Sequence, residues 1–383
     1  MGNRHETQVE CRIAFPFSFA FPLPFLYNTL TMHSRRPSRV VNIGNVAIGG
    51  QNPVAIQSMC TTKTHDTKAT IKQILALEKV GCEIIRVTVP FPKDADALPE
   101  IIKKIHIPLV ADIHFDYRMA IASLQNGAAK IRMNPGNIGK KEWVEEIITV
   151  AKKLKKPMRI GVNAGSLEKD LWEKYGRPSP EALVESALRW IQFFEKHKYH
   201  DLVIALKSSN VPEMIESYER IASKCDYPLH LGVTEAGTFV TGSVKSSVGI
   251  GALLYQGIGD TIRVSLSENP VEEIKVAKEI LKSLHLYQKE RTVIACPTCG
   301  RVEVDLIKLA HQVEKKTAHI KKPIKIAVMG CVVNGPGESR EADYGVAAGR
   351  GCGIIYRHGK IIKTVPEKFL LKELLAIIDA DNL

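Results

Sequence analysis

Aromatic residues are scarce in this sequence: Phe, Trp and Tyr make up 6% of the 383 residues, and only three are Trp. The formal net charge of +12 would by itself suit a nucleic-acid-binding protein. Stacking on bases needs aromatic side chains among basic ones, and no aromatic-rich basic stretch occurs. Much of the excess is Lys in amphipathic segments such as 152–156, which is typical of a solvated helix face. We therefore predict no nucleic-acid partner; basic groups gathered at one pocket would instead suit a small anion.

The sequence also lacks the dense cysteine pattern of a secreted disulfide scaffold. Its eight cysteines fall into two groups of four. The first four are scattered singly, whereas the others lie in the last quarter of the chain: Cys296, Cys299, Cys331 and Cys352. Clustered late cysteines favour a metal or cluster site in a reducing compartment, so we expect a cytoplasmic protein.

Residues 13–32 carry no formal charge, a length that would suffice for a membrane span. Three prolines interrupt this run, at Pro16, Pro22 and Pro24, and no small-residue cleavage site follows it. We interpret residues 1–31 as an extension outside the fold, as would arise if the true start were Met32. A targeting peptide or a membrane anchor is the alternative. We expect no membrane association of the folded part.

From residue 54 onward, short apolar, β-branched runs alternate with amphipathic helical stretches. The expected strands are 54–60, 84–90, 108–114, 130–135, 158–163, 202–208, 229–235 and 261–266. The expected helices include 69–80, 117–125, 140–155, 181–196, 213–224 and 271–284. Eight such units in about 230 residues predict an α/β fold of the (β/α)8 TIM-barrel type. An open doubly wound sheet is the alternative, but no Gly-rich dinucleotide fingerprint follows an early strand.

The pattern changes near residue 288, and a small α/β domain is expected after it. Its expected elements are a strand at 292–295, a helix at 304–315, a strand at 324–329, a Gly-rich hairpin at 345–362 and a closing helix at 367–380. We therefore divide the chain into an extension (1–31), a substrate-binding barrel (32–288) and a C-terminal domain (289–383).

The predicted barrel strands end in polar side chains, where barrel enzymes place their active sites. Pairs spaced by two or four residues point to the same side of a strand. The candidate residues are Arg86, Asp112, His114, Arg132, Asn134, Arg159, Asn163, Lys207, Glu235, Arg263 and Ser265. Four Arg and one Lys converging with few carboxylates would be unfavourable unless an anion filled the space. A substrate with two phosphates would fit, with Glu235 and Asp112 as candidate acid–base groups or hydroxyl acceptors. A polar layer that only stabilises the barrel is the alternative for any single residue.

Cys296-Pro-Thr-Cys299 has the spacing of a metal knuckle, and Cys331 is an isolated third thiol. Either Cys352 or Glu338 could supply a fourth ligand, the latter from a flexible Gly-Pro-Gly-Glu loop. Four thiolates would favour structural zinc or an electron-transfer cluster. Three thiolates and a carboxylate would leave one iron with an exchangeable oxygen ligand. The spacing alone leaves these possibilities open.

Several long motifs resemble the 4-hydroxy-3-methylbut-2-enyl diphosphate synthase family, in its short two-domain bacterial form. The motifs span residues 57–59, 111–116, 130–137, 161–163, 232–237, 296–301 and 329–338, so the resemblance covers roughly residues 35–380. It implies reductive ring opening of 2-C-methyl-D-erythritol 2,4-cyclodiphosphate with loss of water, in the non-mevalonate isoprenoid pathway. Residues 1–31 have no counterpart in this resemblance.

The resemblance also implies a cofactor, partners and roles for residues. It implies a [4Fe–4S] cluster held by Cys296, Cys299, Cys331 and Glu338, with Cys352 as a bystander. Basic and polar residues matching Arg86, Arg132, Arg159, Lys207, Asn163, Glu235 and Ser265 would bind the cyclic diphosphate. Glu235 and Glu338 are the expected catalytic residues, flavodoxin or ferredoxin the electron donor. A homodimer is expected in which the cluster domain caps the partner's barrel. The alternative function is a pterin-binding or methyl-transferring barrel with a structural zinc tail.

Overall fold

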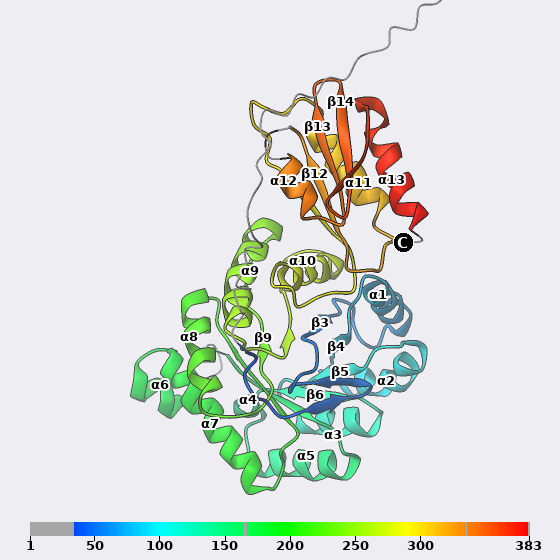
Figure 1. The fold of residues 1–383 in the computed structure, drawn as a ribbon. Coiled ribbons are helices and arrows are strands. Elements are labelled where there is room, and N and C mark those ends of the chain that lie inside the picture. Colours follow the sequence, from blue (N-terminus) through cyan, green and yellow to red (C-terminus); the bar gives the residue numbers. More distant parts are fainter. Residues whose placement is uncertain (1–33, 164–166, 332, 334, 382–383) are drawn as a thin grey trace, which may run out of the picture. The chain divides into compact units, whose positions relative to one another are not determined.

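The computed structural model describes residues 34–163, 167–331, 333 and 335–381. These residues form two compact units that divide after Leu286, and each is described by itself (Figure 1). The interpretation of residues 1–31 concerns a segment outside the described residues. Within the described part of the chain, no helix has both the length and the apolar character needed to cross a membrane.

The first unit is a closed barrel of eight parallel strands. In chain order they are β3 (Ala55–Met59), β4 (Ile84–Thr88), β5 (Leu109–Asp112), β6 (Lys130–Met133), β7 (Met158–Asn163), β8 (Leu202–Lys207), β9 (His230–Leu231) and β10 (Thr261–Ile262). The order in the sheet is β8-β7-β6-β5-β4-β3-β10-β9. A bridge between Ile204 in β8 and Leu229, next to β9, closes the barrel. The prediction of eight strands and a TIM-type barrel is therefore confirmed.

Helices surround the barrel strands (Figure 1). They are α1 (Thr67–Lys79), α2 (Pro92–Lys104), α3 (Tyr117–Gln125), α5 (Lys141–Leu154), α7 (Pro180–Lys196), α8 (Val211–Ala222), α9 (Phe239–Tyr255) and α10 (Pro270–Ser283), with two short additions, α4 (Pro135–Ile138) and α6 (Lys169–Tyr175). Local chemistry fixes their ends. The carboxylate of Asp116 accepts from the Arg118 amide at the start of α3, and Pro180 occupies the first turn of α7. Gly127, with φ +96°, follows α3 and allows the chain to leave the helix.

Strands β9 and β10 are shorter than the expected 229–235 and 261–266. Gly232 lies so close to the next strand that an added Cβ would meet the Arg263 carbonyl oxygen at 2.6 Å. Three residues further on, Glu235 adopts φ +52°, which ends extended backbone. The close approach and the turn explain why β9 stops early.

An N-terminal hairpin of β1 (Val41–Ile43) and β2 (Val46–Ile48) closes one end of the barrel. Its Val41, Ile43 and Ile48 are buried with Ala55 and Ile84, which stand at the beginnings of β3 and β4. The N-terminal end of the barrel is therefore sealed by apolar side chains, and the polar strand ends lie at the opposite end.

The second unit is a five-stranded mixed sheet with helices on both faces. Its strands are β11 (Thr292–Ala295), β12 (Lys325–Met329), β13 (Tyr344–Gly349), β14 (Cys352–Arg357) and β15 (Lys360–Pro366), in that spatial order. The first three are parallel, and β14 and β15 are antiparallel to their neighbours. Helices α11 (Leu306–Lys316) and α13 (Leu370–Ala380) share a core with Ile326 and Val328, whereas α12 (Gly335–Arg340) contacts β12 and β13.

Two local expectations for this unit were wrong. The region expected as one hairpin at 345–362 contains three strands, because a second tight turn at His358-Gly359, both with positive φ, starts β15. The segment expected as a flexible loop before Glu338 forms the short helix α12 instead, and Glu338 lies in its first turn. Gly335 begins this helix against Ala347 of β13, where an added Cβ would lie 2.6 Å from the Ala347 Cβ. Only glycine permits this close approach, so the glycines favour packing here rather than flexibility.

Candidate active site at the barrel mouth and the cysteine cluster

A cavity of about 150 Å3 lies at the carboxyl ends of the barrel strands. Seven of the predicted residues line it together with Gly161, Ala205 and Thr234: Arg86, Arg132, Arg159, Asn163, Lys207, Arg263 and Ser265. They come from five different strands or the turns directly after them. Strand geometry places them here because alternate residues near each strand end point into the barrel.

Other predicted residues lie outside that lining. Asn134 caps α4 by accepting from the Gly136 amide, and His114 is half-buried. Glu235 is exposed and directly follows Thr234 of the lining, in a left-handed conformation that is uncommon for a residue with a Cβ. Such backbone conformations cluster at functional sites. The roles assigned to these three residues stay predictions.

Asp112 lies beneath the cavity as a counterion. Its Oδ1 accepts from Arg132 Nη1 at 2.9 Å, and its Oδ2 lies 3.4 Å from Arg86 Nε. Burial acts to raise the pKa of Asp112, but the charges of Arg86, Arg132 and Arg159 outweigh burial and lower it to about 2. Asp112 is thus ionised at neutral pH, which suits orienting arginines better than donating a proton.

Glu273, which sequence reasoning missed, is the second buried counterion. From the first turn of α10 its Oε1 lies 3.2 Å from Arg263 Nη2, and its Oε2 accepts from Ser58 Oγ at 2.9 Å. The sequence shows only an acidic residue near a helix start, a common pattern. Met59 was also missed as a contact of the site: its sulfur accepts from Arg86 Nη2 at 2.9 Å.

The site carries more positive than negative charge. Arg86, Arg132, Arg159, Arg263 and Lys207 line the cavity, and Asp112 and Glu273 are the carboxylates paired with them. Burial, reinforced by repulsion from Arg159, Arg86 and Arg263, lowers the pKa of Lys207 well below its usual range. Burial likewise lowers the pKa of Arg86 to about 10, against the opposing charge of Asp112. A multiply charged anion would relieve this repulsion, and the arginine forks match phosphate oxygens.

Anion binding is expected to make the protein take up protons. In the free protein burial and the neighbouring arginines lower the pKa of Lys207; an anion favours the ammonium and raises that pKa. At a pH between the pKa of Lys207 in the free protein and its higher pKa in the anion-bound protein, binding consumes protons. The affinity for the anion therefore falls as the pH rises. Calorimetry with sulfate, in buffers of different ionisation enthalpy over a series of pH values, measures this uptake. Lys207→Met should abolish most of it; an unchanged proton uptake in that variant would contradict the assignment.

The predicted cysteine ligands lie at one edge of the second sheet. Cys296 follows β11 and Cys331 comes two residues after β12, and these strands are parallel neighbours. The Cys296 sulfur accepts from the Gly330 amide at 3.2 Å. The loop that carries Cys299 returns to the same place, because the Glu303 amide donates to the Gly330 carbonyl at 3.1 Å. Cys331 is buried, Cys299 and Glu338 are exposed, and Cys352 begins β14, two strands from β12.

In the described residues, no three His, Cys, Asp or Glu side chains are already gathered as metal ligands. The donor set nevertheless fits an iron–sulfur group. Cys296 and Cys331 stand at the ends of adjacent strands, and an amide hydrogen bond to a cysteine sulfur is a feature that tunes such clusters.

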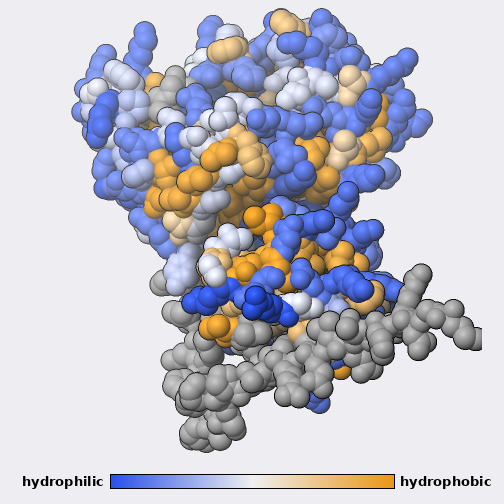
Figure 2. Space-filling view, turned by 90° about the horizontal axis from the view of Figure 1, so that it is seen from above, coloured by the Kyte–Doolittle hydropathy of each residue, from blue (hydrophilic) through white to orange (hydrophobic). Residues whose placement is uncertain are grey.

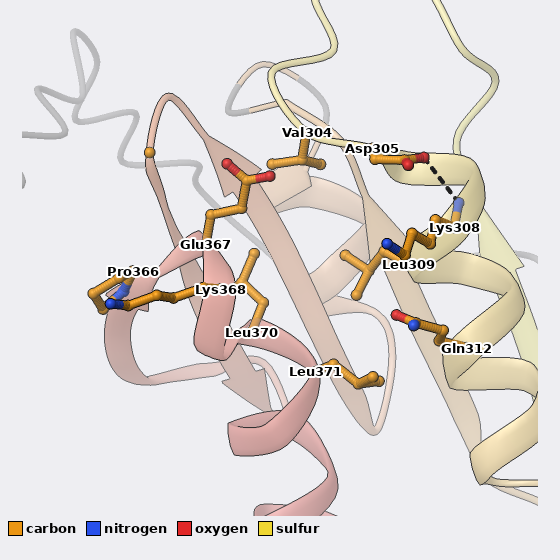
Figure 3. Close-up of a pocket in the computed structure, with 11 residues that line it drawn as sticks. Val304, Asp305, Lys308, Leu309, Gln312, Pro366, Glu367, Lys368, Leu370 and Leu371 are labelled. Atoms are coloured by element: carbon orange, nitrogen blue, oxygen red, sulfur yellow. Dashed lines mark hydrogen bonds between the residues drawn. The ribbon is translucent and has the colours of Figure 1, made fainter.

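A larger cavity of about 700 Å3 lies in the second unit (Figure 3). It lies between the start of α11 and the segment 366–371, with Leu309, Leu370 and Leu371 among its apolar residues. Asp305 caps α11 by accepting from the Lys308 amide there. None of the described lining residues is Cys or His, so this cavity offers no thiol or imidazole ligand for a metal.

Comparison with known proteins extends over both units. Residues 38–278 match the GcpE TIM-barrel domain, and residues 292–380 match the GcpE protein C-terminal domain. A protein of Fusobacterium nucleatum, named 4-hydroxy-3-methylbut-2-en-1-yl diphosphate synthase (flavodoxin), is 59% identical over 90% of this chain and 98% of its own length. A protein of the same name from Caldanaerobacter subterraneus is 57% identical over 90% of this chain and 97% of its own. Among solved structures, the dihydropteroate synthase of Stenotrophomonas maltophilia is 14% identical, with a TM-score of 0.48 over 65% of this chain and 98% of that one.

Proposed function

The chain belongs to the GcpE family of 4-hydroxy-3-methylbut-2-en-1-yl diphosphate synthases, and we propose how its own residues perform that reaction. It is an iron–sulfur oxidoreductase of the non-mevalonate isoprenoid pathway. It converts 2-C-methyl-D-erythritol 2,4-cyclodiphosphate to 4-hydroxy-3-methylbut-2-enyl diphosphate, with uptake of two electrons and loss of water. The observation that carries the residue assignment is the convergence of five basic side chains with two carboxylates at one barrel mouth.

The basic barrel mouth would bind the cyclic diphosphate. Arg132 and Arg86 are held from below by Asp112, so their remaining N–H groups are oriented before the ligand arrives. Arg263 is held in the same way by Glu273, and Lys207 adds a charge without directional constraint. Preorganised donors of this kind stabilise charge without reorganising during the reaction. Asn163 and Ser265 of the lining would bind the remaining polar atoms of the ligand.

Cys296, Cys299, Cys331 and Glu338 would hold a [4Fe–4S] cluster. When bound, that group would supply the electrons for breaking the C–O bond. Glu338, on the short helix α12, would be the exchangeable ligand that a four-thiolate site lacks. Glu235 would hold the proton that leaves with the substrate oxygen as water, since it is exposed beside the lining residue Thr234. In this proposal residues 32–288 bind substrate and residues 289–383 bind the cluster.

Flavodoxin would deliver the electrons, as the names of the relatives indicate for those proteins, with ferredoxin as the alternative donor. We place the protein in the cytoplasm, where the thiols remain reduced. The pterin-binding alternative with structural zinc is not favoured: relatives more than 50% identical over 90% of the chain carry the synthase name. The likeness to dihydropteroate synthase is too low to bear on function.

Helix α9 supports the proposal of a homodimer. Most of its surface is apolar, and Val240, Val244 and Val248 form an exposed ridge along one i, i+4 row. The adjacent row contains Ser243 and Ser247, which with α10 line an apolar groove of about 480 Å3. A two-fold axis would insert the ridge of each copy into the groove of its partner. Exposed hydrophobic patches among hydrophilic residues are also visible in Figure 2. In the proposed dimer each cluster domain caps the partner's barrel.

A charge placed on this ridge is expected to weaken the dimer. Val244→Asp would bury a carboxylate against apolar side chains, so the protein should dissociate by more than about tenfold in Kd. Light scattering at micromolar concentrations measures the molecular mass. Leu75→Asp, a similar change at an exposed residue of α1, is the control and should leave the mass unchanged. If both variants had the mass of the unmodified protein, the ridge would not be the interface.

The test of the function is anaerobic turnover. Protein reconstituted with iron and sulfide is given reduced flavodoxin and the cyclodiphosphate. Formation of the hydroxymethylbutenyl diphosphate product is expected. Metal analysis showing zinc without acid-labile sulfide, together with no product, would overturn the proposal in favour of the zinc alternative.

A further inference from the structure

Four of the buried barrel nitrogens that have no hydrogen-bond partner in the described structure belong to almost completely buried side chains. They are Gln57 Nε2, Lys130 Nζ, Arg159 Nε and His230 Nε2. Each of these four side chains is at most 2% exposed. Buried polar groups are almost always hydrogen-bonded, so four such groups in one barrel require an explanation.

Strand register places these groups together, below the phosphate cavity. Lys130 precedes Arg132 by two residues on β6, and His230 precedes Gly232 by two residues at β9. Because side chains alternate along a strand, both point into the barrel one layer deeper than the cavity. Arg159 reaches into the same region.

Two further observations connect the four groups. Arg159 Nη1 donates to Gln57 Oε1 at 3.0 Å. Burial, followed by the charges of Arg159, Lys207 and Lys130, lowers the pKa of His230 well below its usual value, so these side chains lie around it. The same causes, burial and then the charge of Arg159, lower the pKa of Lys130.

The nearby acceptors are already engaged. Gln57 Oε1 accepts from Arg159, and His230 Nδ1 lies 2.7 Å from Thr261 Oγ1. Asp112 and Glu273 are paired with arginines in the layer above. The apolar hairpin of β1 and β2 seals the barrel from below. When Thr261 Oγ1 donates to His230 Nδ1, the hydrogen of the neutral ring is on Nε2. In that tautomer the four nitrogens are all donors, and the acceptors named here among the described residues are already engaged.

We propose that Lys130, Arg159, Gln57 and His230 form a buried site for a monovalent anion of halide size, beneath the substrate cavity and sharing only Arg159 with its lining. A water molecule fits this environment less well, because its own two hydrogens would also need acceptors. A halide only accepts, and it would compensate the charges of Lys130 and Arg159. The anion would enter through the mouth of the barrel before substrate binds.

Anomalous diffraction from crystals of the unmodified protein grown in bromide tests the site directly. The expected result is a bromide peak within hydrogen-bonding distance of Lys130 Nζ and Arg159 Nε, lost in Lys130→Met. A water molecule at this place, or bromide confined to the outer cavity near Arg132 and Lys207, would overturn the proposal. The unmodified protein alone decides this point if the variant does not fold.

Thermal unfolding gives a second readout in solution. With saturating pyrophosphate occupying the outer cavity, bromide at ten times its Kd should raise the unfolding midpoint by about 3 °C over gluconate at equal ionic strength. The Lys130→Met variant should lose this shift and still bind pyrophosphate. Lys278→Met, which removes a buried lysine of α10, is the matched control and should keep the shift. An equal shift in all three proteins would contradict the inner site.

Discussion

Replacing Cys331 with alanine is expected to remove both the cluster and the activity. Cys331 is buried next to the loop that brings Cys296 to the same sheet edge, so no neighbouring thiol can easily take its place. Loss of a residue that only supports a metal ligand lowers affinity or activity by about 10- to 100-fold, and loss of a ligand should exceed that. Turnover with reduced flavodoxin, together with iron and acid-labile sulfide per chain, measures the effect.

Cys225→Ser is the matched control for this prediction. Cys225 is a free, partly buried thiol of the barrel unit, and no role in cluster binding is assigned to it. The control should keep its iron, its sulfide and its turnover. A Cys331→Ala protein with full iron content and full activity would show that the ligand assignment is wrong. Glu338→Ala distinguishes the carboxylate from Cys352 as fourth ligand, because only a carboxylate ligand makes that variant lose turnover.

Replacing Arg132 with alanine is expected to lower kcat/KM by about 10- to 150-fold. The side chain lines the cavity and is oriented by Asp112 at 2.9 Å, so its loss removes a charge-assisted contact to phosphate. Such contacts contribute about 1.5–3 kcal/mol, and each 1.36 kcal/mol corresponds to a factor of ten in rate. Leaving Asp112 with one fewer partner adds to the loss, since its negative charge would then offset more of the positive potential. Steady-state kinetics and pyrophosphate binding measure the two parts.

Two variants separate the role of Arg132 from a general effect of charge. Arg132→Lys keeps the charge without the fork and should recover only part of the affinity. Arg118→Ala removes an arginine that pairs with Asp116 on the exterior, and it should behave like the unmodified enzyme. Unchanged affinity for substrate and pyrophosphate in Arg132→Ala would refute the placement of the diphosphate.

The sequence predicted the barrel well because its signals are local. Runs such as 158–163 have the strand period and composition, and helix starts such as Asp116 and Pro180 are marked by capping chemistry. The shortened β9 and β10 were not predicted, since they depend on how closely Gly232 approaches a strand that follows it by about thirty residues. Helix α12 was not predicted either. Glycine and proline before Glu338 indicate a loop in the sequence, and the packing of this segment against β12 and β13 is not visible there.

The candidate site was predicted only in part. Polar residues at strand ends identified the seven predicted residues that line the cavity. Glu273 was not predicted as a site residue. Helix α10 packs against β3 and brings Glu273 within hydrogen-bonding distance of Ser58, and this contact forms only when the barrel closes. Asp112 was predicted to be an acid–base group or a hydroxyl acceptor, and its two arginine partners, which no sequence signal indicated, favour a role as their counterion.

By itself, the sequence determined the order of strands and helices, the late cysteine pattern and the excess of basic residues at strand ends. These depend on residue type and spacing along the chain. Only the tertiary structure decided which charges meet, that Asp112 and Glu273 hold the arginines, and that Lys130 and His230 face inward without acceptors. Those properties depend on the register and closure of the barrel, which bring residues from distant strands within hydrogen-bonding distance.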